Sequence, residues 1–170
     1  MIIGCGGSGK TTLARILGEK TGLPVIHLDR IFWSPGNWQH LQPQDFDRRL
    51  MEEMEKPQWI IDGNYSRTME LRLEKCDTVI YLDYNRFVCI WGWLKRVIRN
   101  WGTARPDMGP GCNERLDMEF AKWLWTFNRK NRKKYHQILS RQTDKEIHIF
   151  KTRRQLRKYL KQISVTVRQT

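Results

Sequence analysis

One run of eight residues near the start of the chain constrains the fold more than any other stretch. The run Gly4-Cys5-Gly6-Gly7-Ser8-Gly9-Lys10-Thr11 matches the pattern G-x-x-x-x-G-K-[ST]. Glycines let the backbone curl tightly, so that successive N–H groups point inward at an anion. In this pattern Lys10 reaches the outer phosphates and the Thr11 hydroxyl is placed to bind Mg²⁺. The run therefore predicts a loop that binds a nucleoside triphosphate together with Mg²⁺.

The sequence on either side of this loop agrees with that prediction. Met1-Ile2-Ile3 is apolar and favours a strand, and residues 12–20 carry apolar side chains at helical spacing before Gly22-Leu23-Pro24 ends the helix. The alternative is a glycine-rich turn followed by a chance Lys-Thr, and the order of strand, loop and helix argues against it. We expect ATP to be bound by the loop and the first helical turn, that is by Gly4, Gly6, Gly7, Ser8, Gly9, Lys10, Thr11 and Thr12.

Short apolar runs alternate with helical patterns along the rest of the chain. After residues 1–3 the predicted strands are 25–28, 59–61, 78–82 and 147–150, and the later predicted helices are 43–56, 67–76, 85–100, 114–140 and 152–163. Continuous apolar runs of this length are typical of parallel strands that are buried on both faces. The pattern predicts a single α/β domain, residues 1–170, with a five-stranded parallel sheet and flanking helices.

Aspartates follow three of the predicted strands, at the edge of a parallel sheet where ligands bind. Asp29 comes after the second strand, Asp62 after the third and Asp83 after the fourth. One such carboxylate normally binds Mg²⁺ or its water shell. For Asp83 we prefer the plainer interpretation, in which it caps the helix that follows.

Two irregular stretches, 31–43 and 100–113, interrupt the alternation of strands and helices. Long loops inside a compact domain are usually lids or binding loops. We expect the first to cover a substrate and the second to cover the triphosphate, because closure over the site would exclude water. The tryptophan-rich stretches 90–94 and 123–125 have helical spacing, and we expect them in the helix core.

Positive charge is concentrated in the C-terminal half of the chain. Through residue 94 there are 11 Lys and Arg against 12 Asp and Glu, and from residue 95 onward there are 20 against 6. A basic half is consistent with a nucleic-acid surface and also with a lid that handles phosphates. The four cysteines lack the spacing of a metal site, and no stretch is long and apolar enough to span a membrane. We therefore expect a cytoplasmic protein with reduced cysteines and no membrane partner.

Three further stretches make the chain resemble a known family. They are Leu28-Asp29 with Phe32-Trp33, the run Trp59-Ile60-Ile61-Asp62-Gly63-Asn64-Tyr65-Ser66-Arg67, and the run Thr103-Ala104-Arg105-Pro106-Asp107-Met108. Together with the glycine loop, they make nearly the whole chain similar to adenylate-kinase-like P-loop kinases, and more closely to bacterial DNA topology modulation (FlaR-like) proteins. The resemblance implies the fold of P-loop nucleoside-triphosphate hydrolases with strand order 2-3-1-4-5. It also implies an acceptor-binding segment at about 30–57 and a lid at about 100–113.

The resemblance further implies roles for residues that follow the second and third strands. Adenylate kinases carry Asp-Gly-Phe-Pro-Arg after the third strand, and this chain matches at Asp62, Gly63 and Arg67, with Asn64-Tyr65-Ser66 in place of Phe-Pro. Asp62 would then orient Mg²⁺ through water beside Thr11, and Arg67 would contact the phosphate of the acceptor. The implied acceptor-binding residues are Asp29, Trp33, Asn64, Tyr65 and Arg67. Asp29 would orient or deprotonate an acceptor hydroxyl, a step that a nucleoside monophosphate does not need.

Arginines on both sides of the predicted lid complete the implied site. Adenylate kinases place such arginines around the transferring phosphoryl group, because a planar guanidinium binds phosphate oxygens in two places. The candidates for catalysis, beside Lys10 and Arg67, are Arg96, Arg105, Arg129 and Arg132. The alternative is that these arginines lie on solvated helix faces. After the last strand, Arg153 or Arg154 could stack on the adenine, while a helix start with Thr152 as its cap is the plainer interpretation and is compatible with stacking.

These observations favour an ATP-dependent kinase whose acceptor is a nucleotide or another small molecule. Phosphoryl transfer by this design depends mostly on positioning and electrostatics. The alternative is a DNA-binding protein that is gated by nucleotide and uses the basic C-terminal half. A bare ATPase without an acceptor is a third possibility. We prefer the kinase, because the positive charge is concentrated where a lid needs it and no helix-turn-helix or zinc motif is visible.

Overall fold

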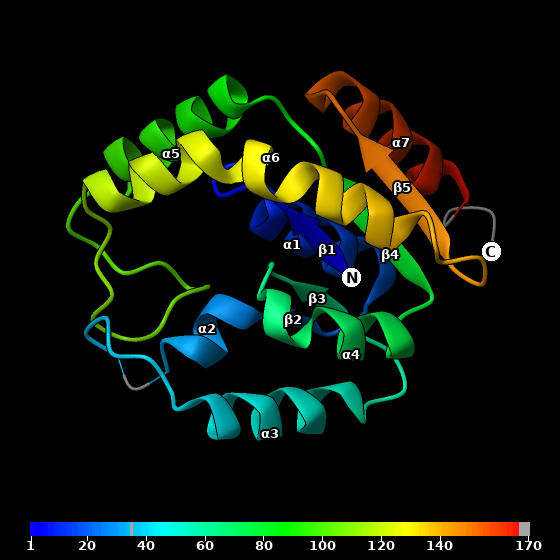
Figure 1. Ribbon diagram of the computed structural model, residues 1–170, viewed down its shortest axis with the longest axis horizontal. Coiled ribbons are helices and arrows are strands. Elements are labelled where there is room, and N and C mark those ends of the chain that lie inside the picture. Colours follow the sequence, from blue (N-terminus) through cyan, green and yellow to red (C-terminus); the bar gives the residue numbers. More distant parts are fainter. Residues whose placement is uncertain (35, 167–170) are drawn as a thin grey trace.

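The chain forms a five-stranded parallel sheet with helices packed around it (Figure 1). The structure is a computed structural model, and it describes residues 1–34 and 36–166. The strands are β1 (Ile2–Gly4), β2 (Val25–His27), β3 (Ile60–Asp62), β4 (Thr78–Leu82) and β5 (Glu146–Phe150). Their order is β2-β3-β1-β4-β5, which confirms the α/β class, the parallel sheet and the strand order expected from the sequence. The carboxyl ends of the strands therefore meet at one edge of the sheet, as the predicted site requires.

Each predicted helix is present, with shifted ends. The helices are α1 (Lys10–Thr21), α2 (Leu28–Phe32), α3 (Pro43–Met54), a 3₁₀ turn (Ser66–Thr68), α4 (Met69–Lys75), α5 (Arg86–Arg99), α6 (Met118–Leu139) and α7 (Arg153–Thr166). The short α2 was not predicted, and the predicted second strand was too long, since Leu28 begins α2 instead. The predicted helix 114–140 begins only at Met118, because the Asp117 side chain accepts hydrogen bonds from the N–H groups of Glu119 and Phe120.

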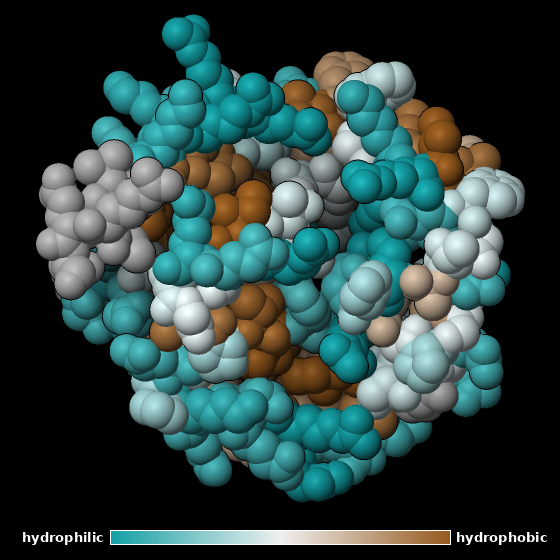
Figure 2. Space-filling view, turned by 180° about the vertical axis from the view of Figure 1, so that it is seen from behind, coloured by the Kyte–Doolittle hydropathy of each residue, from teal (hydrophilic) through white to brown (hydrophobic). Residues whose placement is uncertain are grey.

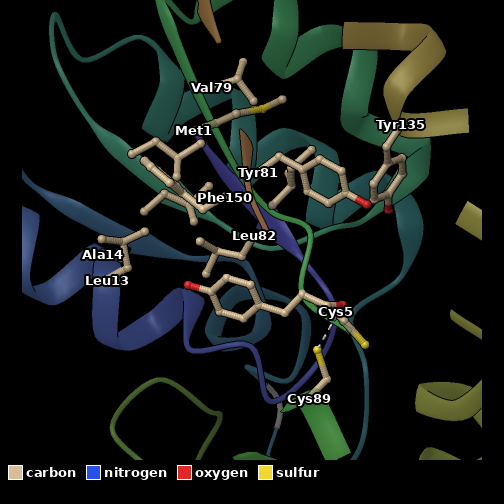
Figure 3. Close-up of a cluster of buried hydrophobic side chains, with 14 of the residues drawn as sticks. Met1, Cys5, Leu13, Ala14, Val79, Tyr81, Leu82, Cys89, Tyr135 and Phe150 are labelled. Atoms are coloured by element: carbon tan, nitrogen blue, oxygen red, sulfur yellow. Dashed lines mark hydrogen bonds between the residues drawn. The ribbon is translucent and has the colours of Figure 1, made fainter. Parts of the chain in front are cut away.

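Two hydrophobic clusters hold the layers together. The larger lies around β1 and β4 and includes side chains from α1, α5 and α6, among them Leu13, Tyr81 and Tyr135 (Figure 3). The smaller joins the β2–β3 side of the sheet to α3 through Ile26 and Phe46. In Figure 1, α3 lies at the lower margin and the α5–α6 pair at the upper left, on opposite sides of the irregular loops. Within the described residues, no helix is both long enough and apolar enough to cross a bilayer.

Two expectations about α5 and its surroundings were wrong. Asp83 does not cap the helix, because the Asn85 side chain accepts the hydrogen bond from the Phe87 N–H instead. Of the tryptophans expected in the helix core only Trp93 is buried, whereas three others are exposed by 41–57%, namely Trp91, Trp123 and Trp125. Hydrophilic side chains cover much of the face in Figure 2, with apolar ones showing between them. The spacing of a helical stripe cannot distinguish a face that meets the sheet from one that meets solvent.

Candidate phosphate-binding site and lid

The glycine loop joins the end of β1 to the start of α1. Lys10 folds back over the loop, and its Nζ donates hydrogen bonds to the carbonyl oxygens of Gly4 and Cys5 at 3.0 and 3.1 Å. Gly9 caps the start of α1 with φ +98°, a left-handed backbone conformation that residues other than glycine rarely adopt. Thr11 and the exposed Thr12 lie in the first turn of α1, where backbone N–H groups have no partner within the helix. The first turn therefore presents unpaired donors and the positive end of the helix dipole at the loop.

Glycines in the loop also permit close packing against α5. A Cβ atom on Gly7 would lie 2.2 Å from the carbonyl oxygen of Cys89, and one on Gly92 would lie 2.1 Å from the carbonyl oxygen of Gly7. A Cβ on Gly6 would meet Phe120 of α6 at 2.7 Å. Figure 3 shows the thiols of Cys5 and Cys89 at this junction, and both residues are buried. The sequence analysis explained these glycines by backbone curvature alone, and the contact with α5 and α6 is a second reason for them.

Asp62 connects the loop to the second strand. Its side chain is buried at the end of β3 and accepts a hydrogen bond from the Thr11 hydroxyl at 3.0 Å through Oδ2. The other oxygen, Oδ1, lies 2.5 Å from Nδ1 of His27. Burial lowers the pKa of His27, but its hydrogen bond to Asp62 and the negative charges of Asp62, Asp107 and Asp29 outweigh burial, so the pKa is raised. The structure thus brings Thr11 and Asp62 together, as expected for a metal pair, and adds His27, to which the sequence analysis gave no role.

The predicted lid closes onto this pair through a chain of charged contacts. Asp107 Oδ2 lies 3.2 Å from the Thr11 hydroxyl and accepts a hydrogen bond from Nη1 of Arg105 at 2.7 Å. Arg105 Nε lies 2.9 Å from Oε2 of Glu114. Arg96 at the end of α5 reaches Oε1 of the same Glu114 from Nε and Nη2, at 3.1 and 3.0 Å. Arg96 and Arg105 are therefore brought together by Glu114, while Asp107 contacts Arg105 alone, and neither buried carboxylate had been assigned a role from the sequence.

The lid also interlocks with the loop that follows α2. The N–H of Asn37 donates to the carbonyl oxygen of Pro110 at 2.9 Å, and the N–H of Trp38 to the sulfur of Cys112 at 3.3 Å. Asn37 and Trp38 have φ values of +51° and +61°, which cost energy for residues other than glycine. A Cβ on Gly109 would lie 1.7 Å from the carbonyl oxygen of Trp33. The two irregular stretches, predicted as separate covers, are thus joined to each other, and Asp107 of the second reaches Thr11 at the start of α1.

The residues predicted to bind the acceptor divide into two groups. Asp29 accepts a hydrogen bond from the Tyr65 hydroxyl at 2.8 Å, and burial together with the Asp29 charge raises the pKa of Tyr65. Trp33 lies beside this pair in the aromatic cluster with Phe32, whose ring is 5.2 Å from that of Tyr65. Asp29, Trp33 and Tyr65 thus lie together, with Trp33 contributed by the irregular stretch 31–43 itself.

Asn64 and Arg67 have other partners. The Asn64 side chain accepts from the N–H of Gly4 at 3.0 Å and donates to its carbonyl oxygen at 2.8 Å, so that it holds the start of the phosphate loop. Arg67 forms an ion pair with Asp47 of α3 and donates to the carbonyl oxygen of Pro43 at 3.1 Å. In this conformation, both side chains brace the loop and α3 and are not directed at an acceptor.

Arg72 of α4 supports the segment after β3 from beneath. It is fully buried and donates hydrogen bonds to the carbonyl oxygens of Gly63, Asn64 and Tyr65 at 2.9, 2.5 and 3.1 Å. Burial lowers the pKa of Arg72 to about 10, so the side chain stays charged at neutral pH. Tyr65 has φ +29°, an unfavourable backbone conformation that these bonds help to hold. A lone arginine in a short helix gave no signal of this role in the sequence.

The remaining predicted arginines lie farther along the carboxyl edge. Arg132 binds Asp83 from Nε and Nη2 at 2.9 Å, and His136 reaches the same carboxylate at 3.1 Å. Arg129 is exposed one turn earlier on α6. A polar cavity of about 220 Å³ lies here, lined by Asp83, Asn85, Arg86, Asn128, Arg132 and Lys151. The structure therefore separates Arg129 and Arg132 from the Arg96–Arg105 pair.

Arg153 begins α7 and lies close to the phosphate loop. A Cβ on Gly92 would lie 3.0 Å from Nη2 of Arg153, and Gly92 itself packs on Gly7. The Thr152 hydroxyl accepts from the N–H of Gln155 at 3.2 Å, which confirms it as the helix cap.

A larger cavity of about 540 Å³ lies at the free edge of β2. It is lined by Pro24, Val25, Ile26, His27, Arg30, Ile31, Ser34, Arg49, Glu52, Glu53 and Lys56. Charges of both signs surround it, and Arg49 donates to the Ser34 hydroxyl at 2.9 Å. His27 belongs to this cavity and to the Asp62 contact, so the cavity adjoins the predicted metal pair.

Among the residues that the structure describes, no three His, Cys, Asp or Glu side chains gather as a metal cluster, and all four cysteines are free. Two carboxylates, those of Asp62 and Asp107, lie beside the Thr11 hydroxyl. Carboxylate and hydroxyl oxygens are hard ligands of the kind that Mg²⁺ prefers when phosphate oxygens supply the remaining ligands. Comparison of the chain with protein-family models and with curated protein sequences found no match.

Proposed function

We propose that the protein is an ATP-dependent kinase that transfers the γ-phosphoryl group to a small acceptor. The observation that carries this proposal is the convergence of Lys10, Thr11 and Asp62 at the mouth of one glycine loop. Loop residues that belong to one sequence motif meet a buried carboxylate from a different strand there. The Ser8 hydroxyl, buried inside the loop without a partner among the described residues, adds a further donor for an anion.

The side chains present fit the Mg²⁺ that such a reaction needs. Thr11 and Asp62 would hold it, because both present hard oxygens and Asp62 keeps Oδ2 turned to Thr11 while His27 occupies Oδ1. When bound, Mg²⁺ neutralises charge on the outer phosphates and so favours attack at phosphorus. Lys10 would exchange its two carbonyl contacts for phosphate oxygens, and Arg96 and Arg105 would stabilise the charge that spreads during transfer.

The acceptor would bind beneath the joined cover, near Asp29, Trp33 and Tyr65. Tyr65 orients the Asp29 carboxylate by its 2.8 Å hydrogen bond, which leaves the second carboxylate oxygen for an acceptor hydroxyl. The cover excludes water, so that transfer to the acceptor outcompetes hydrolysis. The protein's contribution is then mainly to position two substrates and to supply cations.

The test is release of ADP from Mg-ATP in the presence of nucleoside monophosphates, nucleosides and hydroxylated metabolites. We expect one class to stimulate ADP release, and we expect Lys10→Ala to abolish the stimulation, since Lys10 is the loop's phosphate-binding cation. Arg15→Ala, which removes an exposed cation from the same helix, is the matched control. Slow ADP release that no acceptor changes would support the bare ATPase and contradict the kinase.

A second candidate function, nucleotide-gated DNA binding, is favoured by the exposed aromatic face of α5 and α6. Lys95 lies over the ring of Trp91 at 5.1 Å, and Arg86 over that of Trp125 at 5.1 Å. Aromatic rings interleaved with cations are typical of surfaces that bind single-stranded nucleic acid. DNA binding that weakens steeply with salt and is reduced by Trp91→Ala would support this candidate. DNA binding that does not depend on salt, or no DNA binding at all, would contradict this second candidate and leave the kinase as the only proposed function.

A further inference from the structure

A carboxylate from the lid lies beside the proposed metal pair. Asp107 is buried, and its Oδ2 is 3.2 Å from the Thr11 hydroxyl, which is itself 3.0 Å from Oδ2 of Asp62. These three oxygens come from separate parts of the chain, namely α1, the end of β3 and the lid. The inference below rests on the proposed function, since it concerns the metal that ATP would bring.

The hydroxyl cannot satisfy both carboxylates by hydrogen bonding. It carries one proton and can donate to only one of the two oxygens at a time, so the other contact sets two electron-rich atoms near each other. A cation between the three oxygens would remove that conflict. Adjacent ligands of octahedral Mg²⁺, each 2.0–2.1 Å from the metal, are about 2.9 Å apart. The observed separations of 3.0 and 3.2 Å agree with that spacing.

The surroundings of Asp107 hold its carboxylate in place. Arg105 donates to Oδ2 at 2.7 Å, and the N–H of Met108 donates to the carbonyl oxygen of Arg105 at 3.1 Å, so the segment turns back on itself. Glu114 in turn holds Arg105 at 2.9 Å. Glu114 also ties the two ends of the lid together, because its N–H donates to Thr103 and its carbonyl oxygen accepts from Gly102. Carboxylate ligands are commonly oriented by donors behind them in this way.

We propose that Asp107 is a metal ligand delivered by the lid, so that Mg²⁺ is shared by Thr11, Asp62 and Asp107. Metal binding and lid closure are then one coupled step. The metal binds more tightly when the lid is closed, and the lid is held closed more firmly when the metal is bound. A carboxylate that moves with the lid also lets the metal leave when the lid opens.

Mn²⁺ serves as the probe, since it prefers the same oxygen ligands and has a paramagnetic signal that disappears from the free pool on binding. Mn²⁺ is titrated into the full-length protein with a non-hydrolysable ATP analogue, and free Mn²⁺ is followed by electron paramagnetic resonance. We expect Asp107→Asn to weaken Mn²⁺ binding by about tenfold or more, the loss typical when the ligand sphere is disturbed. Asp107→Glu should recover part of it. Asp144→Asn, a loss of an exposed carboxylate far along the chain, should bind as the wild type does.

A second measurement reports on the lid itself. Backbone hydrogen exchange over residues 100–114 is expected to slow when Mn²⁺ and the analogue are added to the wild type, and to slow less in Asp107→Asn. Thermal unfolding of each variant shows whether it is folded. Should Asp107→Asn reduce neither Mn²⁺ affinity nor lid protection, or should it bind Mn²⁺ more tightly because Asp107 had been competing with the metal, the inference is overturned. Failure of the nucleotide binding on which the proposed function rests looks different, since the wild type itself would then not bind the analogue, and failure of the kinase activity alone is measured separately by the release of ADP.

Discussion

The glycine loop and the predicted lid meet at Thr11 but are held by different forces. The loop is fixed by backbone contacts, with Gly7 packed against α5 so tightly that no side chain fits. The lid is held by ion pairs among Arg96, Arg105, Asp107 and Glu114, in addition to its backbone contacts with the loop after α2. Close backbone packing does not depend on salt or pH, whereas ion pairs depend on both to the extent that water reaches them, as at Arg96, whose side chain is 26% exposed. The difference indicates that the loop is a rigid part of the site and the lid a part whose position can be changed by charge.

The strongest way to test the rigidity of the loop is to insert a methyl group where α5 touches it. We expect Gly7→Ala to lower the free energy of unfolding by about 3 kcal/mol, because the new Cβ would lie 2.2 Å from the Cys89 carbonyl oxygen and backbone cannot move aside cheaply. Gly102→Ala is the matched change in the lid, where φ is +69° and nothing lies within 4 Å. It should cost only about 1 kcal/mol, from backbone conformation alone. Urea unfolding measures both, and equal losses would contradict the comparison.

A somewhat smaller effect is expected beneath the segment that follows β3. Arg72→Met should lower the free energy of unfolding by about 2 kcal/mol, since it leaves the buried carbonyl groups of Gly63, Asn64 and Tyr65 without donors. The substitution also removes the cost of burying the charged guanidinium, and this offsets part of that loss. The loss should be nearly independent of salt, because the partners of Arg72 are backbone dipoles. A loss that disappears in 1 M NaCl would place Arg72 with the ion pairs of the lid instead.

Removing the charge of Glu114 should loosen the lid without disturbing the loop. Glu114→Gln leaves Arg96 and Arg105 near one another without their shared carboxylate. Glu114 is buried, but Gln keeps one acceptor oxygen, so we expect the free energy of unfolding to fall by about 1.5 kcal/mol. Burial and the Arg105 charge already lower the pKa of Arg96, which indicates that this pair of cations depends on Glu114. Hydrogen exchange should quicken in 100–114 and stay unchanged in 4–11. Added salt should quicken it in the wild type as well. Equal changes in both segments would show that lid and loop open together.

The smallest expected effect is at the junction of the two regions, where His27 contacts Asp62. The pKa of His27 is raised in the folded protein, so its pair with Asp62 stabilises the fold fully below the unfolded pKa of about 6.5 and less as pH rises through the folded value. In metal-free buffer, the stability difference between the wild type and His27→Gln should therefore shrink between pH 6 and pH 9. Unfolding in urea at both pH values measures it. A difference that grows with pH would contradict the assigned charge of His27.

The sequence predicted the parts of this molecule that depend on local pattern. The glycine loop and the apolar strands could be recognised because each has a signature within a few residues, whereas the strand order and the choice of Asp62 among three strand-end aspartates came from the family resemblance. Asp107 and Glu114 could not be recognised from the sequence, because their contacts form only when the predicted lid folds back toward α1. Asp107 lies 96 residues after Thr11 in the chain. Asp83 was misassigned for a similar reason, since its partners Arg132 and His136 come from a distant helix. Trp91 and Trp125 were wrongly placed in the core, because helical periodicity shows which side chains share one face of a helix but not whether that face packs on the core or contacts solvent.

The interlock between the predicted lid and the loop after α2 has a consequence for the proposed kinase reaction. Pro110 and Cys112 accept hydrogen bonds from Asn37 and Trp38, so movement of either stretch away from the other breaks these hydrogen bonds. In the proposed reaction, release of one product would then be coupled to release of the other. Steady-state kinetics of that reaction should show each substrate slowing the release of its companion, with the left-handed turn at Asn37 and Trp38 as the shared point of contact.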